Sequence, residues 1–193
     1  GPDASAASRE RLLRYIDLAA DVGAPCLRVF GGEPVAAQER SAAIGRVAES
    51  LAAVSGEAQA RGVAVCVETH DAWCLPDDLA AVMRRVNHPA IGVVWDILHP
   101  VRVHKIPIDQ AFAVLQSWIR HVHVHDGMPN STQLAPIGRG CIDHKRAIEL
   151  LTLVAYGGFL SGEWINWSDP LEIHLPRELA VLKSYERSAQ PAR

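Results

Sequence analysis

Four side chains that can bind a metal ion stand at the ends of four short apolar segments: Glu68, Asp96, His123 and Glu163. The segments are rich in Val, Ile and Leu, and helical patterns separate them, which indicates buried strands of a parallel sheet covered by helices. Ligands bind such folds at the carboxyl ends of the strands. Three carboxylates and one imidazole suit a hard divalent cation such as Mn²⁺ or Mg²⁺ better than structural zinc. The sequence therefore predicts a metal site.

Strand periodicity supports an inward position for the histidines of the segment HVHVHD. Successive side chains of a strand point to opposite faces, so Val122 and Val124 share one face, and His121, His123 and His125 share the other. The valines are expected to face the covering helices, which turns the histidines inward. Residues two apart along a strand are separated by about 7 Å, so the three histidines cannot be equivalent ligands of one ion.

The glutamates close strands that are otherwise apolar or small. Glu68 shares a face with Ala64 and Cys66, and Glu163 shares one with Ser161. Burying a carboxylate in such a place is costly unless it is paired or coordinated. An ion pair at the sheet rim would explain one such acid. Four potential ligands on four separate strands favour the metal site.

Helical and strand patterns alternate along the whole chain without a linker or a sequence repeat. The expected strands are 26–30, 63–68, 91–96, 119–124 and 159–163. The expected helices are one capped by Ser8 and ended by Gly23, one over 34–61 ended by Gly62, and others near 77–86, 108–116, 143–155 and 176–188.

This pattern resembles the sugar phosphate isomerase/epimerase family, whose members have the xylose-isomerase-like TIM barrel. The likeness covers nearly the whole chain and is carried by LAADVGAPCLRVFGG, ETHD, GVVWDILHP, IRHVHVHDG, IGRGCID and YGGFLSGEW. The resemblance implies one divalent cation, Mn²⁺, Mg²⁺ or Co²⁺ with Zn²⁺ also open. Its implied ligands are Glu68, Asp96, His123 and Glu163.

The resemblance also implies a substrate and a reaction. A sugar, sugar phosphate or related hydroxycarbonyl compound would chelate the metal, and an enediolate would form when a neighbouring proton is removed. Glu68 and Glu163 would act as the acid and base of an epimerase or isomerase. Side chains expected to contact the substrate are His70, His99, His125 and Arg139. His70, His99 and Arg139 also have a plainer interpretation as polar loop residues.

Three other functions were compared with the same pattern of residues. A dehydratase would form an enolate and then lose a β-hydroxyl group, and an incomplete barrel subunit would not catalyse at all. Apurinic-site endonucleases share the barrel but need further histidines and an Asp-x-His pair. The segments RVFGGE and GMPNSTQLAPIGRG lack these residues, which argues against an endonuclease.

The number of strands differs from that of a complete barrel. Five strands are expected, whereas a closed TIM barrel has eight. Residues 1–193 are therefore interpreted as a single domain that forms the C-terminal portion of the barrel, with the first three strands missing. Truncation, a fragment and a natural partial barrel all remain open. Open sheet edges and an uncovered apolar face predict a homo-oligomer or a complementing barrel fragment as partner.

Composition narrows the class of protein further. The 193 residues are 49% hydrophobic and carry a net charge of −3, with charges of both signs interspersed, which argues against partners such as nucleic acid or an anionic membrane. No apolar run reaches the length of a membrane span, and no signal-peptide pattern opens the sequence. The four cysteines form no C-x-x-C pair, and Cys26 and Cys66 are expected to be buried thiols in a reducing cytoplasm.

Overall fold

Five parallel strands separated by helices form the main sheet of the protein in a computed structural model, which describes residues 2–33, 36–165 and 167–189. The order of the strands in the sheet is β1-β2-β3-β4-β7. Their bounds are β1 Cys26–Val29, β2 Ala64–Glu68, β3 Ile91–Asp96, β4 Ile119–Val124 and β7 Leu160–Gly162. The sequence prediction of five strands in this order is confirmed for the part of the chain that the structure describes.

Seven α-helices lie among the described residues: α1 Pro2–Asp21, α2 Arg40–Ala60, α3 Pro76–Val86, α4 Leu98–His104, α5 Ile108–Leu115, α6 His144–Leu153 and α7 Leu171–Ala189. Short 3₁₀ turns cover Ala37–Glu39, Asp71–Trp73 and Gln116–Trp118. An antiparallel ribbon joins β5 Asp126–Gly127 to β6 Leu134–Ala135. None of the described helices combines the length and the apolar character that a membrane crossing requires.

Three helix starts differ from the sequence prediction. Ser8 is not a cap, because α1 already begins at Pro2, and proline is well tolerated in the first turn of a helix. The long helix begins at Arg40, after a 3₁₀ turn, and its expected start at Pro34 lies outside the described residues. The last helix begins at Leu171 rather than near Pro176.

The early start of α7 has a local cause. The carbonyl of Pro170 accepts hydrogen bonds from the backbone N–H groups of Ile173 and His174, at 3.0 and 2.9 Å. These bonds close the first helical turn ahead of Pro176, which is then accommodated inside the helix. Helix α4 and the β5–β6 ribbon were not expected from the sequence, because both are too short to show a hydrophobic period.

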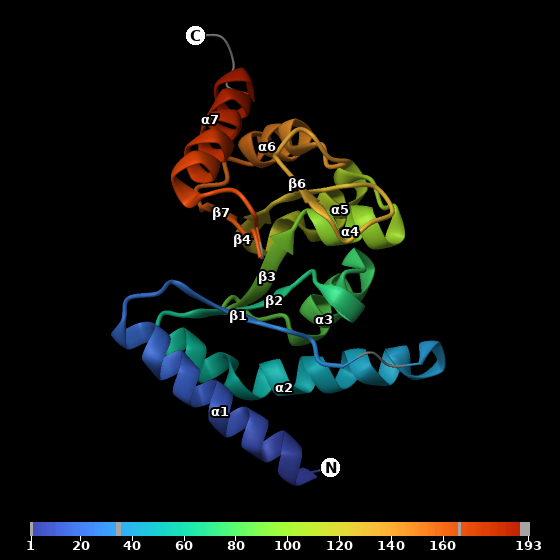
Figure 1. Ribbon diagram of the computed structural model, residues 1–193. Helices are drawn as coiled ribbons and strands as arrows, with labels where there is room; N and C mark the ends of the chain where they lie inside the picture. Colours follow the sequence, from blue (N-terminus) through green and yellow to red (C-terminus); the bar gives the residue numbers. More distant parts are fainter. Residues whose placement is uncertain (1, 34–35, 166, 190–193) are drawn as a thin grey trace. The chain divides into compact units, whose positions relative to one another are not determined.

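The chain forms two compact units, and the prediction of a single domain stays untested. The first unit comprises Gly1–Trp95 and Val114–His121. Within it α1 packs on α2, α2 packs on α3, and β1 pairs with β2, as Figure 1 shows. Its fully buried side chains include Ile16, Ala58, Val65, Val67, Leu79 and Val93.

The second unit comprises Asp96–Ala113 and Val122–Arg193. Helix α6 packs against α7 (Figure 1), and β4 pairs with β7 in a register that sets His123 opposite Ser161. Both Val122 and Val124 are buried, as the alternation in HVHVHD predicts. Other buried side chains of this unit include Leu98, Ala111, Ile137, Ala147 and Ile148.

Close packing in the first unit requires a glycine on β3. A Cβ at Gly92 would lie 2.5 Å from Cγ of Arg120 and 2.9 Å from the carbonyl oxygen of Trp118. A larger residue would displace the chain segment at the start of β4. The glycine therefore allows these neighbouring strands to approach.

The two cysteines expected to be buried differ in exposure. Cys66 is fully buried, whereas Cys26 is half-buried, and neither forms a disulfide. A hydrogen bond with Cys26, together with burial, raises the pKa of the Cys66 thiol. Cys66 is therefore held as a neutral thiol, which is an inert form of the residue.

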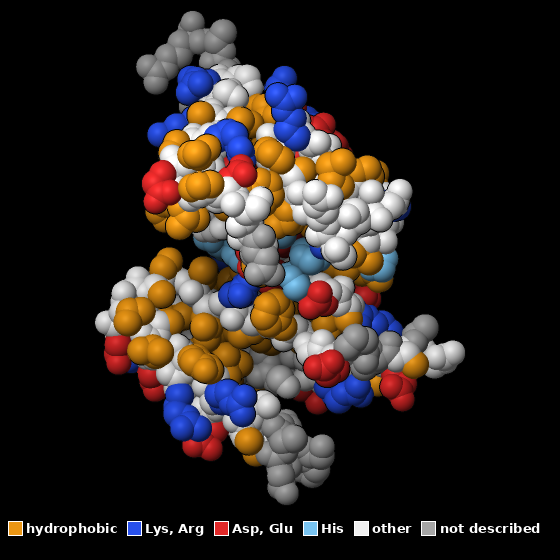
Figure 2. Space-filling model, viewed as in Figure 1, with side chains coloured by type: hydrophobic (Ala, Val, Ile, Leu, Met, Phe, Trp, Pro, Cys, Tyr) orange, Lys and Arg blue, Asp and Glu red, His pale blue; other side chains and the backbone are white. Residues whose placement is uncertain are grey.

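Apolar side chains are exposed on several helices. On α7 they are Leu171, Ile173, Leu175 and Leu179, each at least 45% exposed, and hydrophobic side chains gather over this helix in Figure 2. Surfaces of this kind favour association. The association expected from the sequence stays a prediction.

The start of α6 offers a test of local stability. The side chain of Asp143 caps the helix by accepting a hydrogen bond from the backbone N–H of Arg146 at 2.9 Å. We expect Asp143→Ala to lower the free energy of unfolding by about 1 kcal/mol, because an N–H of the first turn loses its acceptor. Chemical denaturation would measure the loss, and Asp143→Asn, which can still accept the bond, should retain most of the stability.

Candidate functional site

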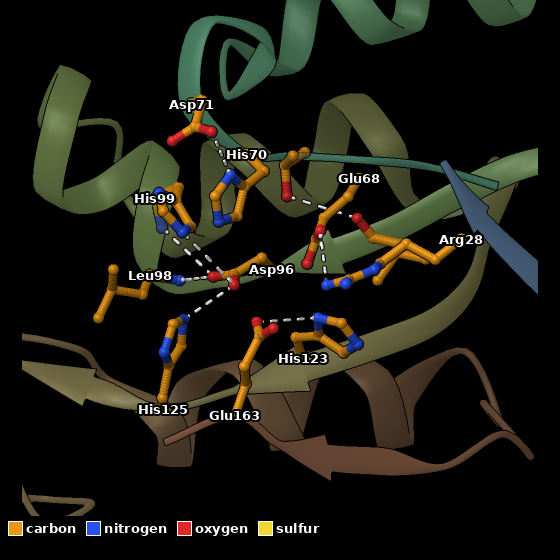
Figure 3. Close-up of polar contacts among 12 residues, drawn as sticks. Arg28, Glu68, His70, Asp71, Asp96, Leu98, His99, His123, His125 and Glu163 are labelled. Atoms are coloured by element: carbon orange, nitrogen blue, oxygen red, sulfur yellow. Dashed lines mark hydrogen bonds and ion pairs between the residues drawn. The ribbon is translucent and has the colours of Figure 1, made fainter. Parts of the chain in front are cut away.

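Asp96 is a fully buried acid of the second unit that several polar groups contact. It ends β3, is fully buried, and accepts hydrogen bonds at Oδ1 from the backbone N–H groups of Leu98 at 2.8 Å and His99 at 3.4 Å. Oδ2 faces two imidazoles, with Nε2 of His125 at 2.8 Å and Nε2 of His99 at 3.8 Å (Figure 3). The first turn of α4 thus fixes one carboxylate oxygen, and the imidazole of His125 contacts the other.

The contacts of Asp96 shift the pKa values of this group. Burial alone would raise the pKa of Asp96, but the hydrogen bond from His125 and the charges of His125 and His99 outweigh it, so the pKa lies below its usual value. Burial alone would lower the pKa of His125, but the hydrogen bond and charge of Asp96 outweigh it and raise that pKa. The arrangement therefore favours an ionised carboxylate at Asp96.

His123 and Glu163 complete a group of potential ligands in the same unit. Nδ1 of His123 lies 3.3 Å from Oε2 of Glu163, and both side chains are half-buried. Asp96, His123 and Glu163 each offer one ligand atom, and these atoms lie within 4.8 Å of one another. The second unit thus brings together three of the four ligands that the sequence predicts.

The fourth expected ligand, Glu68, belongs to the first unit. It ends β2, is fully buried, and its Oε2 lies 3.2 Å from Nη1 of Arg28 (Figure 3). The guanidinium of Arg28 also lies 4.9 Å from the ring centre of Phe30. The carboxylate is therefore compensated by a partly exposed arginine on the neighbouring strand.

His70 lies two residues beyond Glu68 in the first unit. Its Nδ1 is 2.9 Å from Oδ2 of Asp71, and its ring meets Phe30 edge-on with 5.3 Å between ring centres. Asp71 has φ of +44°, a conformation that L residues adopt at a cost. The turn after β2 therefore holds the imidazole ring of His70 between an aromatic ring and a carboxylate.

Arg139 lies in the second unit on an exposed part of the loop 136–142. The glycines beside it were expected to let the backbone approach a ligand, and the structure shows a close approach to Asp126. A Cβ at Gly140 would clash with Oδ1 of Asp126 and with the carbonyl oxygen of Gly127. Gly140 thus lets the loop close around this carboxylate.

The buried carboxylate of Asp126 organises this loop. Its Oδ1 accepts hydrogen bonds from the N–H groups of Gly127 at 2.8 Å and Ile142 at 3.1 Å. Its Oδ2 accepts from Gly138 and Gly140, each at 2.9 Å. Sequence reasoning did not assign Asp126 a role, because its partners lie up to 16 residues away.

His144 and Arg28 were also missed. Nε2 of His144 lies 3.2 Å from the carbonyl oxygen of His125, and burial lowers the pKa of His144. The His144 ring therefore supports the backbone next to the candidate site. The alternation in CLRVF, which sets Arg28 on the face of Cys26 and Phe30, was the available signal for Arg28.

One protein family matches the sequence of this chain. The model of the xylose isomerase-like TIM barrel family matches residues 1–185. No curated protein matches the sequence.

Solved structures of the same fold are similar to the chain. A D-tagatose 3-epimerase-like protein has a TM-score of 0.81 and 19% identity, with 98% of this chain and 72% of that chain covered. A xylose isomerase-like TIM barrel protein from Mycobacterium smegmatis in complex with magnesium has a TM-score of 0.69 and 22% identity, with 92% and 66% covered. The probable 3-DHS dehydratase AsbF from Bacillus anthracis has a TM-score of 0.71 and 20% identity, with 90% and 70% covered. The chain thus spans about two thirds of the length of these structures.

Proposed function

The chain belongs to the xylose isomerase-like TIM barrel family, and from this premise we propose that it is a divalent-metal-dependent isomerase or epimerase of hydroxycarbonyl sugars. The observation that carries the proposal is the group of Asp96, His123 and Glu163 in the second unit, whose ligand atoms lie within 4.8 Å of one another. Two carboxylates and an imidazole beside the ends of parallel strands suit a divalent cation. A solved structure of this fold contains magnesium.

Glu68 is the fourth proposed ligand, and strand register supports it. Glu68 is paired with Val94 of β3, and Asp96 follows Val94 by two residues on that strand. Both acids therefore end neighbouring parallel strands. Three carboxylates with one imidazole form an oxygen-rich donor set that accepts Mg²⁺ or Mn²⁺. Co²⁺ and Zn²⁺ are further candidates.

The proposed chemistry divides between the cation and two glutamates. The bound cation would act as a Lewis acid toward the oxygens of the substrate. One of Glu68 and Glu163 would remove the proton from the carbon beside the carbonyl, and the other would return a proton to the opposite face. This sequence inverts the carbon and gives epimerisation. If one glutamate moves the proton between adjacent carbons, the product is the isomeric aldose or ketose.

Arg28 and the histidines have proposed roles around this step. Arg28 orients the Glu68 carboxylate through their contact at 3.2 Å. We assign His70, His99, His125 and Arg139 to hydroxyl or anionic groups of the substrate, as the sequence suggests. The D-tagatose 3-epimerase-like neighbour supports a sugar as the substrate class.

A dehydratase is the second candidate, and the solved structure of the probable dehydratase AsbF favours it. Both reactions begin with removal of a proton beside a carbonyl group. They differ in the next step, because a dehydratase expels a β-hydroxyl group instead of returning the proton. Product analysis by mass would separate them, since dehydration removes one water from the substrate and isomerisation leaves the mass unchanged.

Metal binding provides the first test of the proposal. We expect one Mn²⁺ or Mg²⁺ per chain in the wild type, and we expect Asp96→Ala and His123→Ala each to abolish stoichiometric binding, because each removes a direct ligand. Isothermal titration calorimetry on metal-free protein would measure it. His104→Ala, on the exposed end of α4, is the matched control. Undiminished binding by both ligand variants would exclude the proposed site.

A further inference from the structure

Arg139 stands at the end of a defined backbone turn. The carbonyl oxygen of Pro136 accepts a hydrogen bond from the backbone N–H of Arg139 at 2.9 Å, which closes a turn of four residues. Gly138, the third residue of this turn, has φ of +82°, the value that a type II turn requires at that position. The direction of the Arg139 side chain therefore depends on how the turn is held.

The loop that contains this turn uses its backbone donors internally. The N–H groups of residues 137–142 all donate within the protein, to the carboxylates of Asp126 and Glu178 and to the carbonyl oxygens of Pro136 and Gly127. Ile137 and Ile142 are buried, whereas Arg139 is exposed. The loop can therefore bind a substrate through the guanidinium of Arg139 but not through its backbone N–H groups.

Two buried carboxylates hold the two central residues of the turn. Asp126 accepts the N–H of Gly138 at 2.9 Å, and Glu178 of α7 accepts the N–H of Ile137 through Oε2 at 2.6 Å. Glu178 is only 1% exposed, although it lies in the middle of a helix. A buried carboxylate is costly unless hydrogen bonds compensate it, so the backbone N–H of Ile137 is a required partner of Glu178.

Neighbouring side chains fix the other oxygen of Glu178. Its Oε1 accepts a hydrogen bond from Nε of Arg177 at 2.8 Å and lies 3.5 Å from Nδ1 of His174. His174 is 0% exposed, and its ring contacts Trp164 and Trp167, with ring centres 4.4 and 4.7 Å away. The carboxylate is therefore held in place with Oε2 on the turn, as a preorganised acceptor.

The backbone of the turn also passes close to α7 at a second point. A Cβ at Gly138 would lie 2.6 Å from Oη of Tyr185. We propose that Glu178 is a positioning residue, which holds the turn 136–139 against α7 and so sets the direction of the Arg139 guanidinium. This inference rests on the proposed function in one respect, the contact of Arg139 with the substrate, and it uses residues of the second unit alone.

Amide hydrogen exchange of the whole protein tests whether Glu178 holds the turn. We expect Glu178→Leu to speed exchange at Ile137 by about tenfold, the order expected when a hydrogen bond to a charged acceptor is lost. Exchange in α6 should stay at the wild-type rate, which shows that the variant folds. Glu178→Gln keeps an acceptor oxygen and should restore slow exchange. The matched control is Glu186→Leu, the same substitution at an exposed position of α7.

Steady-state kinetics at saturating metal, with D-tagatose as the first ketose tested, shows whether the held turn acts through Arg139. We expect Glu178→Leu to raise KM by about tenfold and to leave kcat near its wild-type value, because an arginine in place a tenth of the time weakens apparent affinity by that factor. In an Arg139→Ala background, Glu178→Leu should raise KM no further, since the two residues then act as one unit.

The outcomes separate this inference from the proposed function. Wild-type exchange at Ile137 in Glu178→Leu would overturn the inference, whatever the activity. A KM that Arg139→Ala raises and Glu178→Leu does not would overturn it alone and leave the proposed function intact. Additive effects of the two substitutions on KM would also overturn it. If no candidate ketose is turned over, the proposed reaction fails, and exchange at Ile137 then decides whether Glu178 holds the turn.

Discussion

Glu163→Gln is expected to slow proton exchange at the substrate carbon beside the carbonyl group by about 10²–10⁴-fold, the usual contribution of a positioned acid or base. Glutamine has nearly the size of glutamate but cannot accept the proton. Glu68→Gln is expected to have an effect of the same order, because the proposed mechanism uses one carboxylate on each side of the carbon. Incubation of the whole protein with candidate ketoses in heavy water, followed by mass spectrometry or NMR, would measure the incorporation of deuterium.

This experiment must separate loss of the base from loss of the metal, since both glutamates are also proposed ligands. Exchange is therefore compared at metal concentrations that saturate each variant. Glu172→Gln, on the exposed first turn of α7, is a matched control that should exchange at the wild-type rate. If either glutamine variant exchanges at the full rate with metal bound, that glutamate has no part in proton transfer. A whole protein that binds metal but exchanges no sugar proton would favour a non-catalytic role.

The sheet could be predicted from the sequence because its strands are continuous apolar runs. The bounds of β3 and β4 agree with the predicted 91–96 and 119–124, whose sequences IGVVWD and IRHVHV are rich in Val and Ile. Helix α4 could not be predicted in the same way. It has only seven residues and contains Pro100, so neither its length nor its periodicity distinguishes it from a loop.

Part of the candidate site could also be predicted, for a physical reason. Asp96, His123 and Glu163 are unusual because they interrupt or follow apolar runs, and parallel strands carry their ends to the same edge. Arg28 and Asp126 gave no comparable signal. Their importance depends on partners that folding brings close, 40 residues away for Arg28 and up to 16 residues away for Asp126.

Asp126 therefore supplies a test of structure that the sequence did not suggest. We expect Asp126→Asn to lower the free energy of unfolding by about 2–6 kcal/mol. Each carboxylate oxygen accepts two backbone N–H groups, so an amide NH₂ in place of either oxygen leaves two donors without an acceptor; the two at Oδ1 are buried and the two at Oδ2 are partly buried. A buried donor left in this way costs about 1–3 kcal/mol. Chemical denaturation monitored by circular dichroism would measure the change.

The position of Asp126 makes the same substitution informative about function. It follows His125 directly and holds Gly138 and Gly140, the neighbours of Arg139, so its loss should loosen the loop that carries this arginine. If Arg139 contacts the substrate, KM should rise more than kcat falls in the protein that remains folded. Asp109→Asn, which alters an exposed pair with Arg146, is the matched control and should change neither stability nor KM appreciably. Stability of Asp126→Asn equal to that of the control would show that water or rearranged backbone replaces the lost acceptors, and that Asp126 does not hold the loop.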